Sequence, residues 1–141
     1  FDPFTIGHLD LADRALSMFD ALLIGVCYNI NKPGLEFVES RVESIRQLYS
    51  GNPKVSVEAY SGLTVDFAKR HGARFIVRGL REVKDFEYER NLADTNSAIS
   101  DIETVFLIAS PELGFVSSSM VRELIANNYD ASKFLPKRKN L

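Results

Sequence analysis

The sequence has little cysteine, no long hydrophobic run and no excess of charge of one sign. Its one cysteine, Cys27, cannot form an internal disulfide, and no CxxC or Cys/His spacing indicates zinc. The longest apolar run, residues 21–28, is far shorter than the roughly 20 residues that a membrane span requires. No charged segment followed by an apolar one opens the chain, so secretion is not indicated. These absences favour a cytoplasmic protein without a membrane partner.

The charged residues are nearly balanced, with 17 lysines and arginines against 19 acids and a net charge of −2. This balance argues against broad electrostatic binding to nucleic acid. Of the 141 residues, 45% are hydrophobic and 26% are charged, so the chain can bury a core without disulfides or a structural metal. Its 8 glycines and 5 prolines are scattered and mark no linker. The sequence therefore predicts a single globular domain over residues 1–141.

Apolar residues at helical spacing alternate with short apolar runs that are typical of strands. The helical patterns cover residues 9–19, 38–49, 63–71, 85–99 and 117–125, and the strand patterns cover 21–28, 55–59, 75–77 and 103–108. Strands that alternate with helices predict an α/β fold with a doubly wound parallel sheet. The strand at 55–59 is expected near an edge of that sheet. Cys27 falls inside an apolar strand, so we expect it to serve packing.

Ligands of such sheets bind beyond the carboxyl ends of the strands. The polar segments that follow the strands are therefore the places to look for chemistry, namely residues 29–32, 60–64, 78–81 and 110–119. The usual P-loop, dinucleotide-binding, zinc-protease and Gly-x-Ser-x-Gly signatures are absent from the sequence. A hydrolase triad is not indicated.

Thr5-Ile6-Gly7-His8 stands at the start of the first predicted helix. Gly7 would let the backbone approach a ligand, and the amides of a helix N-terminus favour a phosphate group. His8 would add a side-chain donor at the same place. The alternative is a surface histidine that follows a glycine turn.

Arg78-Gly79-Leu80-Arg81 follows the apolar strand at 75–77. The rigid fork of an arginine suits phosphate oxygens, so two arginines at a strand end predict an anion site. The alternative is an exposed loop whose arginines pair with Glu82, Asp85 or Glu87.

Three serines open the last predicted helix, after Gly114-Phe115-Val116. Serine hydroxyls and helix amides form a phosphate cradle, although plain capping would need only one serine. Two weaker candidates are Lys32, which is otherwise an exposed loop lysine, and Glu89, which could accept hydrogen bonds from a ribose or amino group. A solvated helix face explains Glu89 equally well.

Four blocks of the sequence together resemble a known family of enzymes. They are FDPFTIGH at residues 1–8, VRGLR at 77–81, DFEYE at 85–89 and VSSS at 116–119. In order and spacing they are similar to the bacterial phosphopantetheine adenylyltransferases, which belong to the nucleotidyltransferases marked by a T-x-G-H motif. The tetrapeptide alone indicates only that superfamily, whereas the second and third blocks point to this member.

The resemblance implies a Rossmann-like domain that transfers AMP from ATP to 4′-phosphopantetheine. The products would be dephospho-coenzyme A and pyrophosphate, with Mg²⁺ as the cofactor and a homohexamer as the assembly. Two alternatives stay open. One is another T-x-G-H nucleotidyltransferase with nicotinamide mononucleotide or a cytidylyl acceptor, and the other is a catalytically silent nucleotide-binding module.

The resemblance also implies roles for individual residues. Those implied in catalysis are His8, Lys32 and Arg81. Those implied in ATP binding are Phe1, His8, Gly79, Leu80, Arg81, Glu89, Leu113, Gly114, Phe115, Val116, Ser117, Ser118 and Ser119. Those implied in binding phosphopantetheine are Lys32, Thr64 and Arg78. No residue is implied as a metal ligand.

Family members begin with a strand and a Gly-Ser or Gly-Thr directly before the Phe-Asp-Pro, and neither is present here. We therefore expect about ten further N-terminal residues, which is enough for one strand. The implied reaction also needs no general base, because the attacking phosphate oxygen is already anionic. Catalysis would come from holding two phosphates in line and from offsetting their charge.

Overall fold

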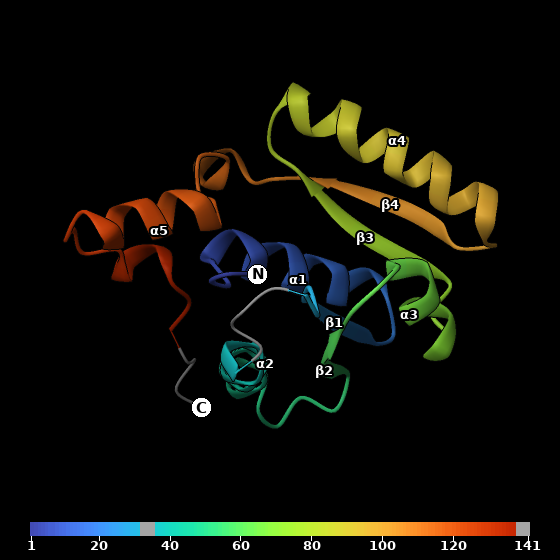
Figure 1. Ribbon diagram of the computed structural model, residues 1–141, viewed down its shortest axis with the longest axis horizontal. Helices are drawn as coiled ribbons and strands as arrows, with labels where there is room; N and C mark the ends of the chain where they lie inside the picture. Colours follow the sequence, from blue (N-terminus) through green and yellow to red (C-terminus); the bar gives the residue numbers. More distant parts are fainter. Residues whose placement is uncertain (32–35, 138–141) are drawn as a thin grey trace. The chain divides into compact units, whose positions relative to one another are not determined.

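The computed structural model describes residues 1–31 and 36–137. Helices and parallel strands alternate along the chain (Figure 1), which confirms the predicted α/β class. The elements are α1 (Ile6–Met18), β1 (Leu22–Cys27), α2 (Glu36–Leu48), β2 (Val55–Tyr60), α3 (Thr64–Arg70), β3 (Phe75–Leu80), α4 (Val83–Ile99), β4 (Glu103–Ile108), the 3₁₀ turn η1 (Pro111–Leu113), α5 (Ser118–Ala126) and the 3₁₀ turn η2 (Ser132–Phe134). None of the helices in the described ranges is long and apolar enough to cross a membrane.

The chain divides into two compact units, each with a two-stranded parallel sheet. The first unit contains Phe1–Ser61 and the chain from Phe115 onward, and the second contains Gly62–Gly114. The single domain that composition suggested stays a prediction.

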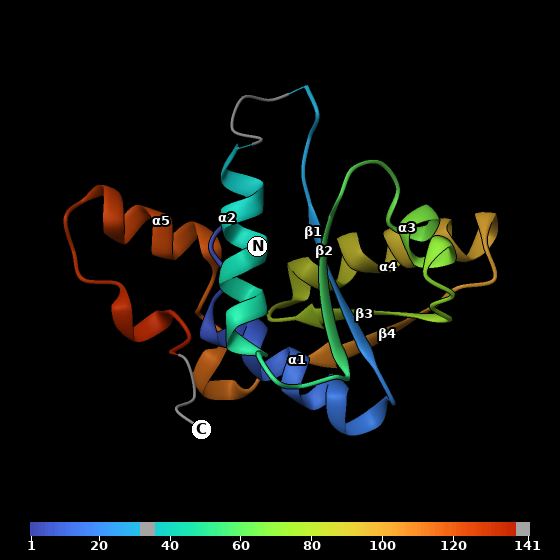
Figure 2. The ribbon, with the colours of Figure 1, turned by 90° about the horizontal axis from the view of Figure 1, so that it is seen from below.

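In the first unit β1 pairs with β2, from Leu22 opposite Val55 to Cys27 opposite Tyr60. Helix α2 runs alongside this pair (Figure 2). Its buried face meets the strands in an apolar core of Phe4, Ala12, Ile24, Val26, Val38, Val42, Ile45 and Val57. The core forms because α2 places valine and isoleucine at three- and four-residue spacing, which turns them to one side of the helix.

Within the described residues β2 pairs with β1 alone, which agrees with its predicted place near an edge. The backbone carbonyls of Lys54 and Tyr60 point toward β1 and accept hydrogen bonds from it. Because successive carbonyls of a strand alternate in direction, the carbonyl of Val57 points away from β1. Arg46 of α2 donates to this Val57 carbonyl from Nε at 3.2 Å and from its terminal nitrogen at 3.0 Å. A side chain thus satisfies part of the open edge.

In the second unit β3 pairs with β4, from Phe75 opposite Glu103 to Leu80 opposite Ile108. Its core is small and consists of Val65, Ala68, Ile76 and Ile102. Helix α4 lies against both strands. Strand β3 runs three residues beyond the predicted end at 77, because pairing with β4 continues to Leu80.

The prediction for Cys27 is wrong. It is exposed, whereas its neighbour Val26 is fully buried. Successive strand side chains point to opposite faces, and Cys27 is the last residue of β1. Not every residue of an apolar run in the sequence is therefore buried in the strand that it forms.

Candidate active site

The T-x-G-H segment forms the start of α1 and holds His8 by a reciprocal cap. Thr5 is the N-cap residue and is almost fully buried. Its hydroxyl accepts a hydrogen bond from the His8 backbone amide at 3.4 Å, and its own backbone amide donates to His8 Nδ1 at 3.0 Å. The histidine thus takes the place that glutamate or glutamine has in the usual capping box.

This cap selects one tautomer of His8. A backbone N–H is always a donor, so Nδ1 must be the unprotonated, accepting nitrogen. In the neutral ring the proton is then on Nε2, which becomes a hydrogen-bond donor. The local backbone therefore presents His8 as a donor suited to an anionic oxygen.

Two aromatic rings pack around the imidazole. The ring centroid of Phe1 lies 4.8 Å from that of His8 in an edge-on arrangement, and that of Phe4 lies at 5.4 Å. Phe4 is buried and Phe1 is 40% exposed. These contacts restrict the rotation of the ring, which keeps Nε2 in one orientation.

The serine segment at the start of α5 lies beside the T-x-G-H segment in the first unit. Ser118 Oγ donates to the Pro3 carbonyl at 2.8 Å, and Arg122 donates to the carbonyl of Asp2. Ser117 is the N-cap of α5 and accepts from the Met120 amide at 3.1 Å. The two N-termini thus meet although they are more than 100 residues apart in sequence.

Both helix starts can bind an anion. The amides of Ile6 and Gly7, at the first two positions of α1, have no acceptor within the helix. The partial positive charge at each N-terminus favours phosphate oxygens. No aspartate or glutamate lies in the first turn of either helix to oppose such a ligand.

In the second unit, Arg78 on β3 forms an ion pair with Glu89 on α4. Arg78 Nε donates to Oε2 at 2.8 Å, and a terminal nitrogen donates to Oε1 at 2.6 Å. The side chain of Glu89 is 11% exposed and that of Arg78 is 39% exposed. The structure thus brings together one residue implied in phosphopantetheine binding and one implied in ATP binding.

Arg81 follows β3 directly and is held by Asp85 in the first turn of α4. The carboxylate accepts from the Arg81 backbone amide at 3.0 Å and from its Nε at 3.3 Å. Partial burial raises the pKa of Asp85, but the hydrogen bonds and positive charge of Arg81 outweigh it, so the net pKa is lowered. This pair is the one that the exposed-loop alternative anticipates.

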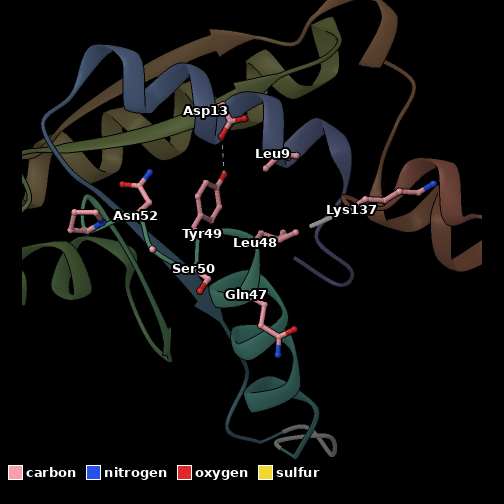
Figure 3. A pocket seen from close by; sticks show the side chains of 10 residues that line it. Leu9, Asp13, Gln47, Leu48, Tyr49, Ser50, Asn52 and Lys137 are labelled. Carbon is pink, nitrogen blue, oxygen red and sulfur yellow. Dashed lines mark hydrogen bonds between the residues drawn. The ribbon is translucent and has the colours of Figure 1, made fainter. Parts of the chain in front are cut away.

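The first unit also contains a pocket of about 340 Å³ between α1, the end of α2 and the turn that follows (Figure 3). Tyr49 points toward Asp13 across it and donates a hydrogen bond at 3.3 Å. Burial, reinforced by the Asp13 charge and this hydrogen bond, raises the pKa of Tyr49. The lining includes no residue implied by the sequence motifs.

Comparison with known proteins decides the family. A family described as cytidylyltransferase-like matches residues 1–124. Phosphopantetheine adenylyltransferase from Bacteroides fragilis is 50% identical over 97% of this chain and 91% of its own length. The enzyme of the same name from Bacteroides thetaiotaomicron is 51% identical over 96% of this chain and 90% of its own length. The one from Leuconostoc citreum is 50% identical over 97% of this chain and 87% of its own length. The chain belongs to the phosphopantetheine adenylyltransferases. The family and the nucleotidyltransferase class that the motifs predict are confirmed.

Most of the remaining site residues that were predicted for this adenylyltransferase lie in the second unit. Gly79 and Leu80 end β3, and Thr64 is the first residue of α3 and half-buried. Leu113 ends the turn η1 and Gly114 is its C-cap residue, whereas Phe115 begins the segment of the first unit that leads to Ser119. Lys32 lies outside the described residues.

Sequence reasoning assigned no role to Thr5, Phe4 or Arg122, although each fixes part of the site in the first unit. Thr5 could have been recognised as the first residue of a capping box, but histidine at its last position hid the pattern. Arg122 donates a hydrogen bond to Ser119 Oγ at 3.3 Å and another to the Asp2 carbonyl. That long-range link has no sequence signal.

Proposed function

We propose that this chain transfers the adenylyl group of ATP to 4′-phosphopantetheine, giving dephospho-coenzyme A and pyrophosphate. The supporting observation is that about half of the residues are identical to those of enzymes of that name, over nearly the whole length of this chain and of theirs. The site geometry adds a physical reason, because it supplies donors for anionic oxygens. In this reaction a phosphate oxygen attacks the α-phosphorus and pyrophosphate leaves.

The first unit would serve the reacting phosphates. His8 would donate from Nε2 to an oxygen whose negative charge grows in the transition state, and the amides at the start of α1 and α5 would bind further oxygens. Because the cap and the ring contacts hold His8 beforehand, little reorganisation is needed when the charge develops. We propose the same charge-offsetting role for Lys32 and Arg81.

We propose that Mg²⁺ enters with ATP. In the described part of the chain no group of three or more histidine, cysteine, aspartate or glutamate side chains could hold a metal ion. Mg²⁺ commonly keeps several waters and binds through substrate phosphates rather than a protein cage. This donor set suits a metal that is bound chiefly by the triphosphate and so belongs to the substrate.

The hexameric assembly and the cytoplasmic location are also proposals. Their support is the family resemblance. Light scattering on the purified protein would measure the mass of the assembly, and a dimer or monomer would contradict the hexamer.

The deciding experiment measures pyrophosphate release by the purified full-length protein with ATP, Mg²⁺ and 4′-phosphopantetheine, with mass spectrometry of the product. Release should need both substrates and give dephospho-coenzyme A. Nicotinamide mononucleotide in place of the acceptor, and CTP in place of ATP, should give little release. Preference for either replacement would overturn the substrate assignment. ATP binding without release under any acceptor would instead indicate a silent module.

A further inference from the structure

Phe115 begins the segment that leads to the serines of α5, and most of its ring lies outside the core. Its side chain is 65% exposed, whereas the next residue, Val116, is buried. The ring of Phe134, from the turn η2, packs against it. The two ring centroids lie 5.8 Å apart and the planes are nearly perpendicular, at 88°. This edge-on arrangement is one of the preferred geometries of an aromatic pair.

The chain returns to Phe115 because it reverses direction after α5. Asn128 has a φ of 61°, in the left-handed region that asparagine adopts more readily than most residues. The amide of Tyr129 donates to the Leu124 carbonyl at 2.9 Å, which closes the end of the helix. The residues that follow run back alongside α5 (Figure 1, Figure 2), and Ala131 among them is buried. A helix cap and a buried side chain therefore fix the place of η2.

Phe134 is also held by contacts other than Phe115. Its backbone amide donates to the Ala131 carbonyl at 2.9 Å, and its side chain is half-buried. Lys133 Nζ lies over the ring of Phe134, 4.8 Å from the centroid, which is a cation–π contact. A ring that is fixed in this way can restrict the more exposed ring that it touches.

We propose that Phe134 is a positioning residue for ATP binding and acts through Phe115 on the nucleotide segment, residues 115–119. The inference rests on the proposed function, in which this segment binds ATP. The same segment meets the start of α1, where Ser118 Oγ donates to the Pro3 carbonyl at 2.8 Å. Ordering a loop when a ligand binds costs conformational entropy. Phe134 removes part of that cost beforehand because it holds the first residue of the segment in place.

The other role that the ring pair could have is support of the fold alone. In that case loss of the ring lowers the stability of the protein, and the binding of the two substrates stays the same or weakens equally. If Phe134 positions the nucleotide segment, loss of its ring weakens the binding of ATP and leaves that of 4′-phosphopantetheine unchanged. The two substrates therefore distinguish these roles.

The test compares Phe134→Leu with the wild type, with Phe134→Tyr and with Tyr129→Leu. Leucine keeps an apolar side chain but removes the ring, whereas tyrosine keeps the ring. Tyr129 lies between α5 and η2 and is 69% exposed. Tyr129→Leu thus removes a ring from the same part of the chain without changing the pair, and it is the matched control.

For Phe134→Leu we expect the KM for ATP, and the Kd for ATP by calorimetry without acceptor, to rise about fivefold. This is the middle of the range that edge-on aromatic pairs contribute. The KM for 4′-phosphopantetheine should stay within about twofold. Phe134→Tyr should restore ATP binding to the wild-type level, and Tyr129→Leu should change neither constant.

An unchanged Kd for ATP in Phe134→Leu would overturn the proposal. Equal rises for both substrates would also overturn it, and so would a Phe134→Tyr variant that binds ATP as weakly as Phe134→Leu. If Phe134→Leu does not fold, Phe134→Met keeps a longer apolar side chain and should give a smaller rise of the same kind. A wild type that binds ATP but releases no pyrophosphate would count against the proposed function instead, and the Kd comparison would still test Phe134.

A double-mutant cycle tests whether Phe134 acts through Phe115. In a Phe115→Leu background the ring pair is already absent, so Phe134→Leu should leave the Kd for ATP almost unchanged. If the Kd rises as much as in the wild type, Phe134 acts independently of Phe115 and the proposal is wrong.

Discussion

Replacing Gly7 by alanine separates what this glycine does for the fold from what it does for a ligand. A Cβ built on Gly7 would lie 3.6 Å from Thr5 Oγ1 and 3.8 Å from the Val116 carbonyl oxygen, which are ordinary contact distances. Gly7 is the second residue of α1, and alanine there lowers the conformational entropy of the unfolded chain. We therefore expect Gly7→Ala to raise the free energy of unfolding by about 0.4–1 kcal/mol.

The same methyl group should impair catalysis. It would stand beside the first amides of α1, where we propose that phosphate oxygens approach. A displaced phosphate loses hydrogen bonds that form only at close range, so we expect kcat/KM to fall at least about tenfold, or roughly 1.4 kcal/mol of transition-state stabilisation.

Urea denaturation followed by circular dichroism gives the stability of Gly7→Ala, and initial rates of pyrophosphate release give kcat/KM. Ser17→Ala, in the last turn of the same helix, is the matched control and should leave the rate unchanged. Unchanged kcat/KM for Gly7→Ala would refute a close ligand approach at Gly7. Reduced stability would refute the conclusion that the fold has room for a side chain there.

Three further substitutions test other parts of the argument. His8→Ala should lower kcat by about 10²–10³ with a smaller change in KM, and weaker ATP binding at unchanged kcat would remove His8 from the transition state. Because the pKa of Tyr49 is raised, its stabilising contribution is complete below its unfolded pKa near 10 and is lost above it. Tyr49→Phe should therefore be less stable than the wild type at pH 8 by urea denaturation, and the gap should narrow as the pH rises above 10; a constant gap would contradict the raised pKa, which burial and the Asp13 carboxylate together cause. Thr104 Oγ1 is buried without a partner among the described residues, so Thr104→Val should keep or raise stability by up to about 1 kcal/mol, and a clear loss in thermal unfolding would reveal an unseen partner.

The elements were predictable because they depend on local patterns. Valine and isoleucine spacing indicated α2, and the serines indicated the start of α5, where Ser117 is the cap. The end of β3 was not predictable in the same way. Pairing with β4, which lies more than 20 residues further along, carries the strand to Leu80.

The candidate site, like the fold, could be predicted only in part from the sequence. The residues themselves could be named from the motifs, and the exposed-loop alternative includes Asp85 among three acids that could pair with the arginines, because only four residues separate it from Arg81. The pairing of Arg78 with Glu89 was not predicted, since it joins a strand to the second turn of a helix. The tautomer of His8 likewise needed coordinates, because it depends on where one backbone amide points.

The contact between Arg46 and the Val57 carbonyl also affects how this protein behaves at high concentration. An edge with open carbonyl and amide groups can recruit a strand from another molecule and so begin aggregation. A cationic side chain laid across the edge occupies one of those groups and repels a second copy with the same arginine. A single long side chain can thus protect solubility without any role in chemistry.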